Sequence, residues 1–125
     1  MKTRDTKILL VDDEQDILDL LSYNFKKLGY DVHTAQDGYQ GITEVELFQP
    51  DVIVSDILMP KLSGIKMCRQ LKADDRYKNI PIIFLSASND EYLALSSFDA
   101  GGVKYLSKPV HMNILFDLVG KVVAA

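Results

Sequence analysis

Four short hydrophobic runs in this chain each end in a residue with a reactive polar side chain. The runs begin at Lys7, Val52, Ile82 and Val103, and they end in Asp12-Asp13, Asp56, Ser86 and Lys108-Pro109, respectively. Short apolar runs bounded by polar residues are typical of buried parallel strands. If these strands lie side by side and run the same way, their carboxyl ends share one edge, where open α/β sheets bind ligands. The pattern therefore predicts an edge that carries three carboxylates, a hydroxyl and an ammonium group.

Helical patterns separate the predicted strands. Apolar residues recur every three or four positions at Ile17, Leu21, Phe25 and Leu28, which predicts a helix over residues 14–28 that Asp13 caps and Gly29 ends. We expect a weaker strand over 31–35 and further helices over 38–48, from the loop at 59–64 to about 72, over 89–100, and over 111–122. Strand and helix thus alternate five times, which predicts a parallel sheet with helices on both faces. Because no linker or repeat is visible, we expect residues 1–125 to form a single domain.

Composition and charge exclude several classes of protein. The 125 residues are 47% hydrophobic and 26% charged, as in ordinary globular domains, and the net charge of −4 argues against direct nucleic-acid binding. No apolar run approaches the ~20 residues that span a bilayer, and residues 1–5 lack a signal-peptide pattern. The single Cys68 cannot form an intramolecular disulfide, and we expect it to be a small core residue. We therefore expect a cytoplasmic protein without membrane contact.

The predicted edge has the chemistry of a metal site that handles phosphate. Two unit charges 4 Å apart repel by about 4 kcal/mol at an effective dielectric of 20, so clustered carboxylates hold protons or bind a cation. Hard oxygen ligands without histidine or thiolate favour Mg²⁺, with Mn²⁺ as the alternative. Lys108 adds positive charge for phosphate oxygens. Asp56 stands alone at its strand end and is the candidate nucleophile, whereas Asp12 and Asp13 are candidate metal ligands.

The motifs together resemble the receiver domain of bacterial two-component response regulators, over roughly residues 7–122. The matching segments are Val11-Asp12-Asp13-Glu14, Asp56-Ile57-Leu58-Met59-Pro60, Ser86-Ala87 and Tyr105-Leu106-Ser107-Lys108-Pro109. Each motif alone is weak, but four in this order at predicted strand ends are specific. The resemblance implies a flavodoxin-like three-layer sandwich, in which five helices cover a parallel sheet of order 2-1-3-4-5. That order makes the first and third strands neighbours.

The resemblance also implies what the acidic residues do. Asp56 would accept a phosphoryl group from a sensor histidine kinase or a histidine phosphotransfer protein. Asp13 and Asp56 would bind Mg²⁺ through their carboxylates, and Asp12 would do so largely through water. Leu58 would contribute its backbone carbonyl alone, so its apolar side chain is no objection.

Three further residues match positions that respond to phosphorylation in this family. Ser86 would hydrogen-bond one phosphoryl oxygen and Lys108 would pair with another, with the Lys108-Pro109 peptide in the cis form that the family typically shows. Tyr105 matches an aromatic residue that turns inward when the hydroxyl residue moves to the phosphate. The output surface would then be the fourth helix, the fifth strand and the fifth helix. The sequence names neither the cognate kinase nor the effector.

Other interpretations exist for every one of these residues. Asp12 and Asp13 could cap the first helix, Asp56 could shape a turn, and Ser86 could be an ordinary loop hydroxyl. Lys108 could be solvated, and Tyr105 could be ordinary strand packing. A Mg²⁺-dependent phosphatase that passes through an aspartyl-phosphate is the alternative function. A degenerate receiver that binds partners constitutively is disfavoured, because all five key side chains are present.

Two positions of the family pattern bear on dephosphorylation. Leu58 and Ser88 occupy positions whose side chains flank the phosphoryl group and influence water attack in receiver domains. An apolar side chain at position 58 offers no group that orients water. We therefore expect slow autodephosphorylation, from a protein that assists its own phosphorylation and is not a conventional enzyme.

Overall fold

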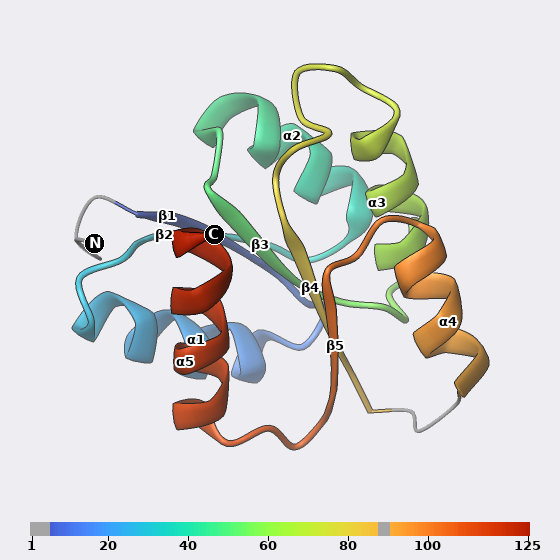
Figure 1. Cartoon of the computed structure of the whole chain (residues 1–125). Coiled ribbons are helices and arrows are strands. Elements are labelled where there is room, and N and C mark those ends of the chain that lie inside the picture. Colours follow the sequence, from blue (N-terminus) through green and yellow to red (C-terminus); the bar gives the residue numbers. More distant parts are fainter. Residues whose placement is uncertain (1–5, 88–90) are drawn as a thin grey trace.

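The structure, a computed structural model, describes residues 6–87 and 91–125, and in these residues five strands alternate with five helices (Figure 1). The elements are β1 (Lys7–Val11), α1 (Gln15–Lys27), β2 (Asp31–Ala35), α2 (Gly38–Phe48), β3 (Val52–Asp56), α3 (Gly64–Lys72), β4 (Ile82–Ser86), α4 (Glu91–Asp99), β5 (Lys104–Ser107) and α5 (Met112–Ala124). The positions of residues 88–90, including Ser88, lie outside this description.

All four strand pairings are parallel, and the strand order is β2-β1-β3-β4-β5. The predicted fold class and strand order are therefore confirmed. The register pairs Val11 of β1 with Ser55 of β3. The residues that follow this pair, Asp12 after β1 and Asp56 at the end of β3, consequently lie at the same edge of the sheet.

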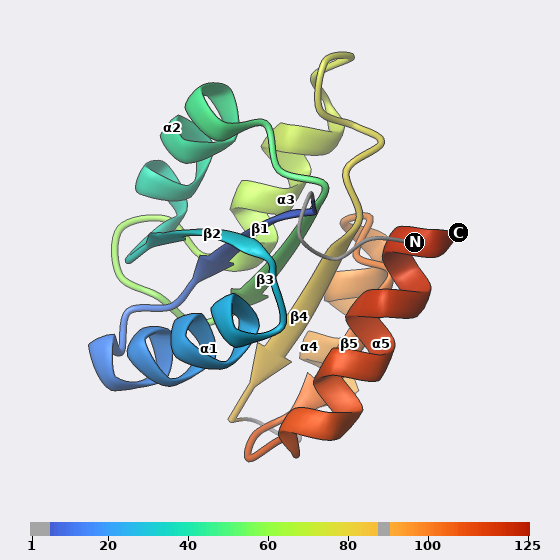
Figure 2. The ribbon, with the colours of Figure 1, turned by 90° about the vertical axis from the view of Figure 1, so that its left-hand side faces the viewer.

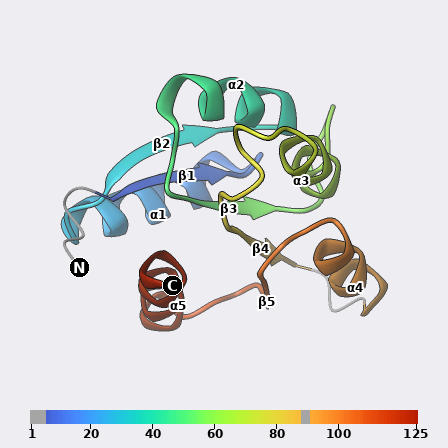
Figure 3. The ribbon, with the colours of Figure 1, turned by 45° about the horizontal axis from the view of Figure 1, so that its top comes forward.

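Helices cover both faces of the sheet, and each face has its own core. Figure 3 shows α2 and α3 on one side of the sheet and α1 and α5 on the other, and Figure 2 gives the same layers from the side. Leu9, Ile53 and Phe84 belong to the cluster under α2, α3 and α4, whereas Leu10, Val54 and Leu85 belong to the cluster under α1 and α5. Neighbouring strand residues point to opposite faces, so burial of both faces explains the uninterrupted apolar runs.

Helix α1 differs in detail from its sequence prediction. Its N-cap is Glu14, so the expectation that Asp13 caps it is wrong. Leu28, which was expected in the buried stripe, is the C-cap residue and is 43% exposed. Leu18 is buried instead, together with Leu21 and Phe25. The buried face is therefore rotated slightly from the one that the spacing predicted.

The C-terminal elements follow the prediction with small shifts. Helix α4 is described from Glu91, so the expected start at residue 89 lies outside the described residues. Strand β5 begins at Lys104, one residue later than expected, and α5 continues to Ala124. Cys68 is buried and its thiol donates to the Ala100 carbonyl over 3.3 Å, in agreement with a core role. No helix within the described residues has the length and apolar character needed to cross a bilayer.

Candidate functional site

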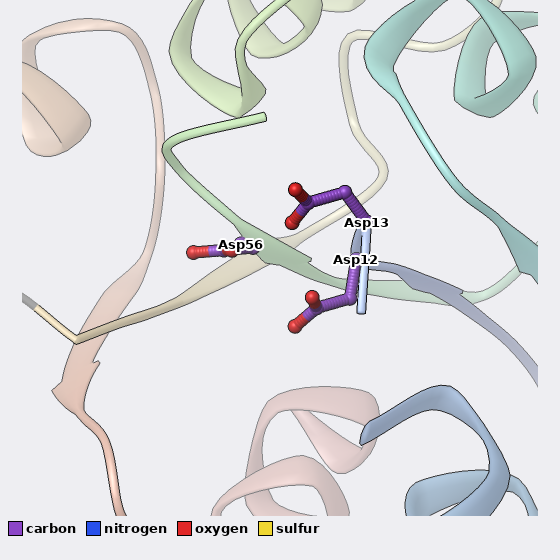
Figure 4. A group of neighbouring side chains, drawn as sticks. All are labelled: Asp12, Asp13 and Asp56. Atoms are coloured by element: carbon purple, nitrogen blue, oxygen red, sulfur yellow. The ribbon is translucent and has the colours of Figure 1, made fainter. Parts of the chain in front are cut away.

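Three carboxylates meet at the carboxyl edge of the two central strands. Asp12 and Asp13 follow β1, and Asp56 is the last residue of β3. One carboxylate oxygen from each residue lies within 4.8 Å of the others, and Figure 4 shows all three groups extending to the same side. Asp12 and Asp56 are 3% and 8% exposed, whereas Asp13 is exposed. The predicted acidic cluster therefore exists, and it is open to solvent on the Asp13 side.

Both oxygens of Asp12 are engaged. Its Oδ1 accepts a hydrogen bond from the backbone N–H of Glu14 over 2.9 Å, which forms a local turn ahead of α1. Its Oδ2 accepts from Lys108 Nζ over 2.8 Å. Asp12 thus joins the start of α1 to the residue that follows β5. Asp12 forms a turn ahead of α1 and does not cap the helix, because Glu14 is the N-cap. Its role as a metal ligand stays a prediction.

Asp56 is held by its neighbour and faces a lysine. The backbone N–H of Ile57 donates to Asp56 Oδ1 over 2.8 Å, and Oδ2 lies 3.6 Å from Lys108 Nζ. Burial raises the pKa of Asp56 from 3.8 to about 6; the Lys108 charge and the Ile57 bond oppose this rise, whereas Asp12 and Asp13 add to it. The carboxylate that the sequence singled out as the nucleophile is therefore more basic than an ordinary aspartate.

Lys108 is the cation of the site, and its side chain is only 14% exposed. Its Nζ also lies 3.9 Å from Glu14 Oε1. Burial disfavours the ammonium form, but the hydrogen bond to Asp12 and the charges of Asp56, Asp12 and Glu14 outweigh this and raise the pKa of Lys108. The interpretation of Lys108 as a solvated lysine is wrong, and its peptide bond to Pro109 is cis as expected.

The remaining predicted residues lie on or near the same edge. Ser86 ends β4 and is 1% exposed, and its carbonyl accepts from the Lys108 N–H over 2.7 Å. Tyr105 pairs with Phe84 in the sheet and is half-buried against the core under α2, α3 and α4. Leu58 follows Asp56 by two residues and is 60% exposed. The structure thus places Ser86, Tyr105 and Leu58 at or near this edge of the sheet. Their roles toward a phosphoryl group stay predictions.

The donor set fits a hard divalent cation. The cluster that the described residues form consists of carboxylates alone, without histidine or thiolate. Mg²⁺ prefers oxygen ligands and keeps several waters, so a few carboxylates on an open side suit it. Asp12, Asp13 and Asp56 could hold it, and a cation there would relieve their mutual repulsion.

Comparisons with known proteins identify the family. The model of the response regulator receiver domain matches residues 8–120. The chain belongs to this family. The receiver is 42% identical over 103 residues to the alkaline phosphatase synthesis transcriptional regulatory protein PhoP of Bacillus subtilis. It is 39% identical over 103 residues to the DNA-binding dual master transcriptional regulator RpaA of Synechocystis. The matches cover 82% of this chain but 42% and 43% of those relatives, so the receiver corresponds to less than half of each.

Solved structures agree with this assignment. A response regulator from Chloroflexus aurantiacus superposes with a TM-score of 0.91 at 28% identity, covering 96% of this receiver and 98% of that chain. The chemotaxis response regulator CheY4 of Vibrio cholerae gives a TM-score of 0.87 at 28% identity, covering 94% and 98%. The family resemblance that four motifs carried is therefore confirmed. Receiver domains are regulatory and bind Mg²⁺ in an acidic pocket, which matches the cluster described above.

Three residues near the acidic cluster were not predicted from the sequence as parts of the site. The Ile57 N–H and the Glu14 carboxylate both act near the charged cluster. Gly64 opens α3, and a Cβ there would collide with the Asp56 carbonyl oxygen. A glycine directly after a loop and at the first position of a helix was the signal that could have found this close approach.

Proposed function

We propose that this receiver is a phosphorylation-operated switch, in which Asp56 accepts a phosphoryl group from phosphohistidine on a sensor histidine kinase or a histidine phosphotransfer protein. The main support is the setting of Asp56: a buried carboxylate with a pKa of about 6, in an acidic cluster, 3.6 Å from a lysine ammonium. A basic carboxylate oxygen beside a fixed cation suits nucleophilic attack on phosphorus.

The transfer step follows from this arrangement. Asp56 Oδ2 attacks the phosphorus atom, the P–N bond to the donor histidine breaks, and the electron pair leaves with the imidazole nitrogen. Lys108 and Ser86 pair with phosphoryl oxygens of the resulting acyl phosphate. Mg²⁺, held through Asp13, Asp56, the Leu58 carbonyl and a water on Asp12, would neutralise charge between the carboxylates and the incoming group.

The signal would leave through α4, β5 and α5. The phosphoryl group biases a two-state equilibrium through Ser86 and Tyr105, and a change from 1:99 to 99:1 needs about 5.5 kcal/mol of differential interaction. Three large apolar side chains of α4 are well exposed: Tyr92 at 73%, Leu95 at 68% and Phe98 at 49%. Exposed apolar groups gathered on one helix support a surface that a partner covers.

The decisive experiment is labelling of the purified protein with radioactive acetyl phosphate and Mg²⁺. We expect one acid-stable, alkali-labile label, which Asp56→Asn abolishes. Asp75→Asn serves as the matched control, because Asp75 is 93% exposed and pairs with Lys78 away from the cluster. Persistent labelling of Asp56→Asn would show that another residue is the acceptor.

The lifetime of the label tests the expectation of slow autodephosphorylation. Leu58, two residues after the acceptor, is 60% exposed, and its apolar side chain itself carries no polar atom that could orient water. We expect a half-life of minutes or longer in Mg²⁺, shortened by Leu58→Asn; a half-life of seconds would contradict the proposal. The same leucine disfavours the alternative phosphatase, since phosphatases of the haloacid-dehalogenase type have a second aspartate two residues after the nucleophile.

The proposal also covers the extent of the domain, its localisation and its partners. Residues 1–125 would act as one domain in the cytoplasm, without membrane contact, and would pass the signal to an effector domain or protein. The relatives are named as transcriptional regulators, but a net charge of −4 does not favour DNA contact by the receiver itself. Phosphotransfer profiling against the host's histidine kinases would identify the donor.

A further inference from the structure

The peptide group between Asp56 and Ile57 is hydrogen-bonded at both ends. Its carbonyl oxygen accepts from the Ser55 hydroxyl over 2.8 Å, and its N–H donates to Asp56 Oδ1 over 2.8 Å. The next carbonyl, that of Ile57, accepts from the Gly64 N–H over 2.9 Å. Three consecutive bonds therefore fix the segment of backbone from which the acceptor carboxylate extends.

Ser55 is placed for this contact by the strand. It is 1% exposed and lies in β3 between Val54 and Asp56, in a strand whose residues are all buried. Strand alternation directs it to the face of Ile53, toward α3, and directs Asp56 to the other face. A Cβ built on Gly64 would lie 3.0 Å from Ser55 Oγ, so the first residue of α3 packs directly over the hydroxyl. The one hydroxyl among the five buried residues of this strand thus has a specific place.

The two oxygens of the Asp56 carboxylate are made different by this peptide. Oδ1 is bound by the Ile57 N–H, whereas Oδ2 lies 3.6 Å from Lys108 Nζ. Rotation of the Asp56–Ile57 peptide would turn its N–H away from Oδ1 and release the carboxylate from this orientation. The hydroxyl of Ser55 resists that rotation from the opposite end of the same peptide.

We propose that Ser55 is a positioning residue for the phosphoacceptor. By donating to the Asp56 carbonyl it holds the following peptide, whose N–H holds Oδ1 and leaves Oδ2 presented toward Lys108 and the incoming phosphoryl group. This inference rests on the proposed function for its kinetic consequence, but the hydrogen-bond relay itself can be measured without phosphate or metal.

The experiment compares Ser55→Ala with Ser55→Thr, which keeps the hydroxyl. The matched control is Ser97→Ala, because Ser97 is also fully buried and donates to a carbonyl, that of Ala94, over 2.7 Å within α4. Two quantities are measured: the rate constant of phosphorylation by acetyl phosphate at saturating Mg²⁺, per folded molecule, and hydrogen exchange at the Ile57 amide in EDTA. Urea unfolding gives the folded fraction of each variant.

We expect Ser55→Ala to slow phosphorylation roughly tenfold, because a misplaced reacting group reacts more slowly, and to speed exchange at Ile57 relative to the amides of β3. Ser55→Thr should restore both quantities, and Ser97→Ala should change neither. The proposal is overturned if Ser55→Ala keeps the wild-type rate constant, or if its rate falls while exchange at Ile57 is unchanged. If the wild-type protein accepts no phosphoryl group at Asp56, the proposed function fails, and exchange at Ile57 still decides whether Ser55 orients the peptide.

Discussion

Replacing Asp56 by asparagine should make the metal-free protein more stable at neutral pH. The carboxylate is 8% exposed and shares its site with Asp12 and Asp13. Asparagine has the shape of the protonated acid, and its Oδ1 can still accept from the Ile57 N–H. The substitution therefore removes the burial and repulsion of a charge while it keeps the local hydrogen bond.

The pKa of Asp56 gives the size and the sign of this effect. The pKa is about 6 in the folded protein against an ordinary value of 3.8. Between these two values the folded protein binds the proton more tightly than the unfolded chain, so the free energy of unfolding falls as the pH rises. At 1.36 kcal/mol for each pKa unit, the loss is about 3 kcal/mol and is complete above pH 7. The Asp56→Asn variant has no carboxyl group to ionise at this position, so its free energy of unfolding should not fall in this way.

Urea unfolding in EDTA at several pH values between 4 and 8 measures the difference directly. We expect wild type and Asp56→Asn to have similar free energies of unfolding near pH 4. Near pH 8, the free energy of unfolding of the variant should be higher by about 3 kcal/mol. Asp75→Asn, at a 93% exposed carboxylate, should differ from wild type by less than about 0.5 kcal/mol at every pH. A variant that is no more stable than wild type at pH 8 would refute the account of Asp56 as a destabilising buried charge.

Two further predictions concern the cation and the backbone around the site. Mg²⁺ at ten times its dissociation constant should raise the free energy of unfolding of wild type by about 1.4 kcal/mol, and removal by EDTA should reverse this in thermal melts. The gain should shrink in Asp56→Asn, and an equal gain would place the cation elsewhere. Gly64→Ala should lower stability by about 1–3 kcal/mol or more and slow phosphorylation, because its methyl group collides with the Asp56 carbonyl. Gly120→Ala, with no atom within 4 Å of the added group, should instead stabilise α5 by up to about 1 kcal/mol in the same urea titration.

The sheet and the acidic cluster could be predicted because both depend on a short-range pattern with few solutions. Apolar runs that end in polar residues predict buried strands, and parallel strands bring their carboxyl ends together. The register of Val11 with Ser55 then makes Asp12 and Asp56 neighbours without any further adjustment. The strand order itself came from the family resemblance, since periodicity does not distinguish one order of parallel strands from another.

Details that depend on where helices end and on tertiary contact could not be read from the pattern. Leu28 continues the apolar spacing of α1, but Gly29 at φ 94° turns the chain directly after it. Tyr30 fills the core at that point, with its ring 5.2 Å from that of Phe25 in an edge-on contact. The 2.8 Å bond of Lys108 to Asp12 likewise joins residues 96 positions apart, and no local signal indicates which carboxylate the lysine prefers.

The features that destabilise the site are those that suit Asp56 to its proposed chemistry. A pKa of about 6 leaves the carboxylate about nine-tenths ionised at pH 7, so it is available as a nucleophile yet more basic than a solvated aspartate. Greater basicity strengthens the bond that such an oxygen forms to phosphorus, while burial limits the access of competing water. Cation binding would relieve the crowding of like charge around Asp12, Asp13 and Asp56. Phosphorylation would add negative charge there, because it replaces the carboxylate of Asp56 by a phosphoryl dianion that needs the cation and Lys108 as partners. Contacts of that dianion that differ between the two conformations would shift their equilibrium, which connects this concentration of charge to a switch.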